Sequence, residues 1–268
     1  IARQIANAQT LINVLSTLVG LVLVGQLVKL VTRIVPGEEI VIERGPMYLD
    51  THVMSTPSIA LGQASKELTR MANLTLEMLS YAMQPFIETK PNLNIIRKNI
   101  QQREDAVDSL ASEITRYLSK VSQHSLSPEQ SRRLIALMHN VSDIERVGDH
   151  AENILELGEE KRLEKLPFSD LALKETNELS LKVLTMYENM IKAFANDDKD
   201  AAREAQKYEN EVDALSRNAR NEHMKRLNEG ICHPTAGVIF LDLVANLERV
   251  ADHANNLGYS TIGEITKM

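Results

Sequence analysis

Pairs of acidic residues four positions apart are the feature of this sequence best suited to chemistry. Four such pairs stand at related places: Glu104 with Asp108, Glu145 with Asp149, Glu209 with Asp213, and Glu248 with Asp252. Residues four apart lie on one face of an α-helix, where two like charges repel by about 0.2 to 0.5 kcal/mol. Because the chain has 37 acidic residues, one pair alone would indicate only a solvated helix face.

The pairs belong to a duplicated motif. The nine residues from Glu145 to Asn153 return as Glu248 to Asn256, with seven of nine positions identical at a constant offset of 248 − 145 = 103. The pair at Glu104 returns at Glu209, at an offset of 105. A duplication at fixed spacing indicates an internal repeat, and makes chance a poor explanation for the acidic pairs.

Counted outward from the turns between helices, the two acidic pairs of each repeat lie within about 5 Å of the same height. Four carboxylates in one place need either raised pKa values or a bound cation, and the cation is the simpler solution. Oxygen ligands suit hard ions such as Mg²⁺, Mn²⁺ or iron. Asn153 and Asn256, one turn along the stripe, could act as neutral ligands or hold the carboxylates. His150 and His253 point about 100° away from the stripe and are expected to orient or pack rather than ligate.

The elements that must position these residues are predicted to be helices. The sequence has no Trp and is rich in Leu, Ala, Glu and Lys, which favours an all-α fold. Ser127 to Gln130 forms a capping box with proline at the first turn. Apolar residues at helical spacing predict helices at about 57–83, 92–121, 128–157, 169–195, 198–227 and 234–262. Short turns between long helices predict two tandem antiparallel three-helix bundles, at 56–160 and 161–268.

The N-terminal segment has a different character. No charged residue occurs from Gln4 to Val28, which is longer than the roughly 20 residues that span a bilayer. We expect residues 1–35 to be a transmembrane segment, with a buried helix hairpin as the alternative, and residues 36–55 to be a linker. Lys29 and Arg33 would place the following residues in the cytoplasm. The chain opens with Ile and has no signal peptide, which suggests a fragment.

Several function classes are disfavoured. The net charge of −7 argues against a nucleic-acid partner. The single cysteine, Cys232, excludes an intramolecular disulfide framework. None of the seven histidines follows a glutamate by three positions, which argues against an oxygen-activating di-iron centre of the ferritin type. No nucleophile paired with a base is evident, so a catalytic role is not expected.

The duplicated Glu-Arg-Val-x-Asp-His-Ala-x-Asn motif, with Glu-x-x-x-Asp on the preceding helices, resembles the PhoU family of phosphate-signalling proteins over about residues 56–263. The resemblance implies two three-helix bundles that hold multinuclear metal clusters, with Mg, Mn, Fe or Zn as candidates. By position, the implied metal ligands are Glu104, Asp108, Glu145 and Asp149 in one bundle and Glu209, Asp213, Glu248 and Asp252 in the other.

The stretches 7–13, 35–38 and 56–64 look like the end of sodium/phosphate cotransporters that carry a C-terminal PhoU-like domain, although Gln9 and Ile12 depart from that pattern. This resemblance implies a bacterial inner-membrane location. It also implies the membrane half of the same transporter as a partner, and inorganic phosphate and sodium as the ions carried. A homodimer is a further possible assembly.

The resulting hypothesis is a cytoplasmic, metal-binding regulatory domain of a phosphate cotransporter. One alternative is a structural or partner-binding helical bundle without metal, and another is a hydrolytic or redox metalloenzyme.

Overall fold

The structure is a computed structural model that describes residues 2–34 and 42–263. Over those ranges it is helical and has no strand, which confirms the all-α prediction. The elements are α1 (Ala2–Ile34), the short 3-10 helix η1 (Thr51–Val53), α2 (Pro57–Ile87), α3 (Leu93–Val121), α4 (Pro128–Leu163), α5 (Asp170–Asn196), α6 (Lys199–Asn228) and α7 (Pro234–Ile262).

The first helix, α1, belongs to a separate unit of the chain, Ile1–Val41. Across the described residues, no helix combines the length and the apolar character that crossing a membrane requires. Polar residues such as Asn7, Asn13 and Thr17 occur among the apolar ones of α1, and each would cost free energy in hydrocarbon. The predicted transmembrane segment and the inner-membrane location derived from it are therefore corrected.

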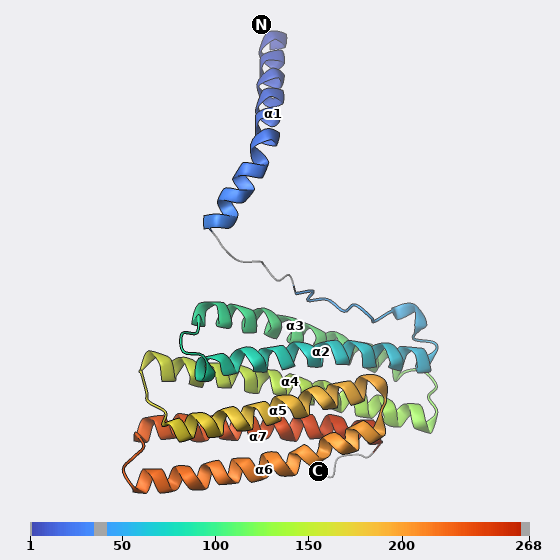
Figure 1. Cartoon of the computed structure of the whole chain (residues 1–268). Helices are drawn as coiled ribbons and strands as arrows, with labels where there is room; N and C mark the ends of the chain where they lie inside the picture. The colour runs from blue at the N-terminus through green and yellow to red at the C-terminus, as the bar shows by residue number, and fades with distance from the viewer. Residues whose placement is uncertain (1, 35–41, 264–268) are drawn as a thin grey trace. The chain divides into compact units, whose positions relative to one another are not determined.

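The remaining helices form one compact unit that begins at Ile42. In Figure 1, α2, α3 and α4 form one group of three helices, and α5, α6 and α7 form the second group beside it. Contacts between the groups run chiefly between α4 and α7 and between α2 and α5. One continuous apolar core extends through both groups and includes Leu68, Val107 and Leu243. The three helices of each repeat thus fold against the other repeat rather than as a separate body.

Several helix starts follow the side chains that the sequence offers. The Ser127 hydroxyl accepts a hydrogen bond from Gln130 N, and the Gln130 side chain accepts one from Ser127 N, so the predicted capping box is present. Asn92 and Ser169 cap α3 and α5 in the simpler way, by accepting from a backbone N–H three residues on. At the other end of the molecule, α7 stops at Gly263, whose φ of 87° is left-handed and suits glycine.

Two helices are longer than the sequence predicts. The helix predicted to end near position 83 continues as α2 through Pro85 to Ile87. The helix predicted to end near position 157 continues as α4 to Leu163. The two extensions support each other, because Arg162 Nε donates to the carbonyl of Pro85 at 2.6 Å. A proline in the last turn of a helix removes only one backbone hydrogen bond. Packing of these ends against each other compensates for that loss.

Polar contacts join the two bundles inside the core. The Tyr187 hydroxyl on α5 is fully buried and lies 2.8 Å from the Thr75 hydroxyl on α2. Asn140 on α4 donates to Ser260 on α7 at 2.8 Å. Buried polar groups that find partners only across an interface favour one register of packing over others.

Residues 42–50, here called the strap, lie along the first bundle. The predicted linker 36–55 covers this segment, and its part from 36 to 41 lies outside the described residues. The Glu67 carboxylate on α2 is completely buried and accepts from Met47 N and Tyr48 N at 2.8 and 2.7 Å and from Arg70 Nε at 2.6 Å. The strap is therefore an ordered part of the bundle.

Candidate metal centre

The first acidic patch lies where α3 and α4 run side by side. We define acidic patch 1 as Glu104 and Asp108 on α3 with Glu145, Asp149 and Glu152 on α4. Burial raises the pKa of Glu104, and the nearby charges of Glu152, Asp108 and Asp149 add to the effect. Burial also raises the pKa of Glu145, with the charges of Asp149 and Asp108 adding to it. The structure thus brings together all four predicted ligands of this bundle.

Glu104 is the most perturbed member of the patch. Its pKa rises from 4.5 to about 8, first because the side chain is half-buried and then because of the charges of Glu152, Asp108 and Asp149. Its Oε2 atom is buried and has no hydrogen-bond partner among the described residues. This atom lies under Gly148, where even an added Cβ would remain at an ordinary contact distance of 3.4 Å. A buried acceptor without a donor is a position that a proton or a cation would satisfy.

Acidic patch 2 is the equivalent place between α6 and α7, formed by Glu209, Asp213, Glu248 and Asp252. Burial raises the pKa of Glu209, with Asp213 and Asp252 adding to the effect and a hydrogen bond from Asn255 opposing it. Burial also raises the pKa of Asp252, supported by the charges of Glu248 and Asp213. The four predicted ligands of the second bundle are again close together.

Basic side chains offset part of this charge. Arg220 on α6 forms a salt bridge with Glu248 in patch 2. Near patch 1, Arg44 of the strap pairs with Asp105 at 2.8 Å, and Arg146 lies 3.9 Å from Asp149. Within residues 2–34 and 42–263, no group of three or more His, Cys, Asp or Glu side chains is arranged as ready-made ligands for a metal ion. The carboxylate oxygens of the patches are therefore the type of ligand that a hard cation prefers. In the side-chain rotamers of this structure, however, they do not surround a metal position.

The histidines of the duplicated motif face the contact between the two bundles. The rings of His150 on α4 and His253 on α7 stack with their centroids 5.7 Å apart. His150 Nδ1 lies 2.9 Å from Asn246, and His253 Nδ1 lies 2.9 Å from Asp143. These two partners are themselves related by the repeat offset, since 143 + 103 = 246. Burial lowers the pKa of His150.

The two motif asparagines lie in different surroundings. Asn256 donates to Asp143 at 2.9 Å and so belongs to the contact between the bundles, and Asn153 is exposed. The structure gives neither amide a hydrogen bond to an acidic patch.

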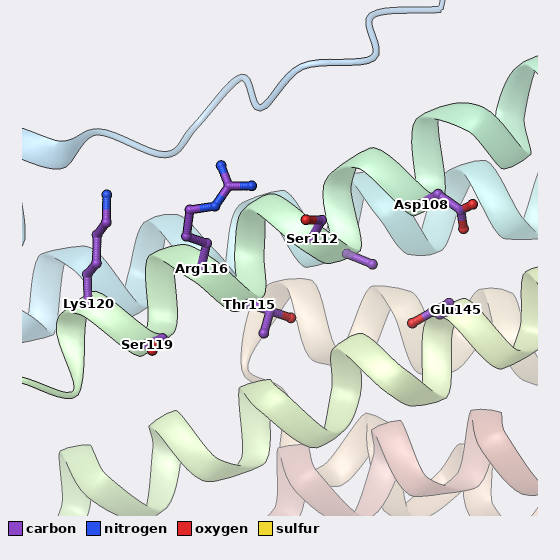
Figure 2. A pocket seen from close by; sticks show the side chains of 8 residues that line it. Asp108, Ser112, Thr115, Arg116, Ser119, Lys120 and Glu145 are labelled. Carbon is purple, nitrogen blue, oxygen red and sulfur yellow. The ribbon is translucent and has the colours of Figure 1, made fainter.

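An open groove of about 840 Å³ runs along α3 and α4 beside acidic patch 1. Figure 2 shows Asp108 on α3 and Glu145 on α4 at one end of it, and Ser119 and Lys120 at the other end. Between them lie the hydroxyl-bearing Ser112 and Thr115 and the side chain of Arg116 (Figure 2). Ala111 also lines the groove. The groove therefore gives solvent and small ions direct access to the carboxylates of patch 1.

Two residues that matter to these places were missed by the sequence argument. Glu152 belongs to patch 1 and lies three residues after Asp149, a spacing that puts both on one helix face, so the same stripe argument could have found it. Asp143, the partner of His253, carries no signal in its own spacing. Its recognition needs the packing of α4 against α7, which sequence alone does not supply.

Fold and site together define the class: an all-α protein made of two repeated three-helix bundles, with an acidic patch at the same place in each repeat. The PhoU domain family matches residues 68–158 and 176–261. The chain belongs to this family.

Individual relatives agree with the assignment. The chain is 27% identical over 197 residues to the phosphate-specific transport system accessory protein PhoU homolog 1 of Thermotoga maritima, which covers 72% of this chain and 84% of that protein. It is 22% identical over 253 residues to the putative inorganic phosphate export protein YjbB of Escherichia coli K12, which covers 93% of this chain but only 46% of that longer protein. The crystal structure of PhoU from Pseudomonas aeruginosa has the same fold, with a TM-score of 0.69, 20% identity, and coverage of 74% of this chain and 93% of that one.

Proposed function

We propose that this chain is a regulatory domain of inorganic phosphate transport, without catalytic activity of its own, that binds metal ions at its two acidic patches. Membership of the PhoU domain family supports the connection to phosphate transport. The names of the relatives, an accessory protein of phosphate-specific transport and a putative phosphate export protein, point the same way. On this proposal its partner is a phosphate transport protein. The sodium-dependent cotransporters that its N-terminal residues resemble are the specific candidate.

The observation that carries the metal proposal is the crowding of carboxylates around Glu104. Three acidic side chains, Glu152, Asp108 and Asp149, act on a half-buried carboxyl whose pKa is raised to about 8 and whose Oε2 has no donor among the described residues. Folding a protein around such a group costs free energy that surface acids do not cost. A cation in the patch would convert mutual repulsion into shared attraction, which makes the arrangement favourable.

The ligands proposed for one site are Glu104, Asp108, Glu145 and Asp149, and the corresponding four acids of patch 2 are proposed for the other. All are oxygen donors, which suit Mg²⁺, Mn²⁺ or iron more than soft metals, with Zn²⁺ as a further candidate. Side-chain rotations must accompany loading, because no ligand group is preformed among the described residues. In patch 2, Glu248 must also exchange Arg220 for the metal. A bound cation would supply positive charge reachable through the groove beside patch 1.

Metal content and thermal stability test the proposal. The full chain, stripped with chelator, is titrated with Mg²⁺, Mn²⁺, Fe²⁺ or Zn²⁺ while its Tm is followed, and bound metal is measured by elemental analysis. At a free metal concentration 100 times Kd, stabilisation of about 2.7 kcal/mol is expected. For a compact unit of this size that corresponds to a rise in Tm of roughly 5 to 10 °C. The double variant Glu104→Gln with Asp149→Asn should lose the metal of patch 1 only, and Glu160→Gln, an exposed acid on α4, serves as the matched control.

Absence of bound metal together with an unchanged Tm for all four ions would overturn the metal proposal. The chain would then be the partner-binding bundle without metal, with its acids neutralised by protons and arginines. The regulatory part is tested separately in cells, by comparing phosphate flux with the wild-type chain and with the patch variants. A variant that loses its metal but leaves phosphate flux unchanged would contradict the proposal that the metal sites regulate transport. It would leave the proposal of metal binding intact.

A further inference from the structure

A partly open pocket in the second bundle shares no lining residue with either acidic patch. It occurs where α6 ends and where α5 and α7 begin, and its volume is about 140 Å³. That volume exceeds the roughly 30 Å³ that one water occupies in the liquid, so the pocket can hold several waters or one tetrahedral anion of five heavy atoms. We call it the α5–α7 pocket. Its lining consists of Pro167, Phe168, Ser169, Ala172, His223, Ile231, Cys232, His233, Ala236, Gly237 and Phe240.

The side chain of His223 is a buried polar group of this pocket without a partner. It is only 2% exposed, its ring packs 5.3 Å from that of Phe240, and no hydrogen bond joins its nitrogens to any described residue. Its Cε1 and Nε2 lie 2.8 Å from where a Cβ on Gly237 would stand, so the ring edge faces the first turn of α7. In the described part of the chain, no His223 nitrogen is among the fully buried polar atoms that lack a partner, so the ring edge is open to the pocket, where a ligand or an ordered water could bind it.

The first turn of α7 supplies further donors. Its N-cap residue, His233, makes no side-chain capping hydrogen bond, and Pro234 occupies the first helical position. The first N–H groups of a helix have no partner inside the helix and carry the positive end of its dipole. The neighbouring start of α5 differs, because Ser169 accepts from Ala172 N at 3.2 Å. The uncapped terminus is thus the one whose first turn meets His223.

Two buried cations contact aromatic side chains of the pocket lining, although neither lines the pocket itself. Arg226 is 5% exposed, forms a bidentate pair with Glu175 at 2.9 and 2.7 Å, and lies over the Phe240 ring at 5.7 Å. The Nε atom of Arg226 is buried with no acceptor among the described residues. Lys161, 8% exposed, lies over the ring of Phe168 at 4.9 Å. Because Glu175 already pairs with Arg226, Lys161 is the cation of the two that leaves net positive charge beside the pocket, which favours an anionic ligand.

We infer that the α5–α7 pocket binds a small tetrahedral oxyanion such as inorganic phosphate, held by the His223 imidazole and the uncapped first turn of α7. Backbone N–H groups at a helix start together with a buried side-chain donor are a recurrent arrangement for phosphate groups. The choice of phosphate as probe rests on the proposed function. The pocket itself does not depend on the acidic patches or on metal.

Phosphate titration of the full chain in the presence of chelator tests the inference. Calorimetry should show saturable binding of one phosphate per chain. His223→Gln should weaken it about tenfold or more, as expected for the loss of a hydrogen bond to a charged group. Gly237→Ala should weaken it as well, because the added Cβ stands 2.8 Å from the His223 ring and reduces the pocket. His139→Gln, at an exposed histidine on α4, is the control and should bind as the wild type does.

Cys232 provides a second readout that needs no variant. It is the single cysteine of the chain and lines the pocket, so phosphate should slow its reaction with a maleimide in the wild-type chain. Absence of binding, or binding with no effect on Cys232 and none from His223→Gln, overturns the inference. Binding that disappears in Glu209→Gln with Asp252→Asn but persists in His223→Gln also overturns it, while leaving the proposed function intact. Binding that persists in the patch 2 variant and is lost in His223→Gln supports the pocket independently.

Discussion

Replacing Glu104 by Gln should stabilise the metal-free protein at neutral and alkaline pH. The pKa of this carboxyl is raised from 4.5 to about 8, mainly by burial and then by the charges of Glu152, Asp108 and Asp149. A rise of that size corresponds to roughly 5 kcal/mol at about 1.4 kcal/mol per pKa unit. Because the side chain is only half-buried, solvent screening reduces the effect, and we expect about 2 kcal/mol.

The sign follows from proton binding. Between pH 4.5 and 8 the folded protein keeps a proton on Glu104 that the unfolded chain has released. Stability therefore falls as the pH rises through this window, and the loss is complete above the folded pKa. Glutamine cannot ionise, so the variant lacks this contribution. Urea denaturation in chelator at pH 5, 6, 7 and 8 measures the difference.

Wild type should lose about 2 kcal/mol more between pH 5 and pH 8 than the Glu104→Gln variant does. Glu160→Gln, an exposed site on the neighbouring helix, should keep the wild-type slope. Equal slopes for wild type and Glu104→Gln would refute the reasoning, because they would show that this carboxyl ionises as easily in the folded chain as in the unfolded one.

Three further substitutions probe the packing. Gly158→Ala places a Cβ 2.7 Å from the Pro85 side chain and should lower stability by about 1 to 3 kcal/mol in urea denaturation, whereas an unchanged midpoint would contradict the close approach of α2 and α4. Glu67→Gln removes the buried carboxylate that holds the strap, so trypsin should cleave after Arg44 much faster than in the wild type. An unchanged cleavage rate would show that other contacts hold the strap. Tyr187→Phe leaves the α2 hydroxyl without its buried partner and should cost about 1 to 2 kcal/mol, with no loss expected if water replaces the phenol.

The helices and the pairing of acids into two patches could be predicted because both depend on local periodicity. The spacing of Glu104 and Asp108 fixes their common face, and the capping box fixes where α4 begins. The passage of α2 through Pro85 could not be predicted, since the compensating contact comes from Arg162, 77 residues later. The α5–α7 pocket was missed for the same reason: His223 matters only because Gly237 lets α7 approach it.

The N-terminal helix illustrates a different limit. Absence of charge from Gln4 to Val28 is a statement about ionic groups only, and it gave too much weight to a run that also contains amide and hydroxyl side chains such as Asn13 and Thr17. An amide or hydroxyl without a partner costs roughly 2 to 7 kcal/mol in an apolar medium, which is less than a charge costs but enough to matter when several occur in one helix.

The stacked histidines have a consequence for how the repeat can diverge. His253 faces a carboxylate on Asp143, while His150 faces an amide on Asn246 at the equivalent place. An assembly of two identical single-repeat chains would be obliged to carry the same residue at both places, giving two carboxylates or none. Because the two repeats are joined in one chain, their residues can differ. One histidine can therefore contact a carboxylate and the other an amide, and the two bundles can evolve different functions while they keep packing against each other.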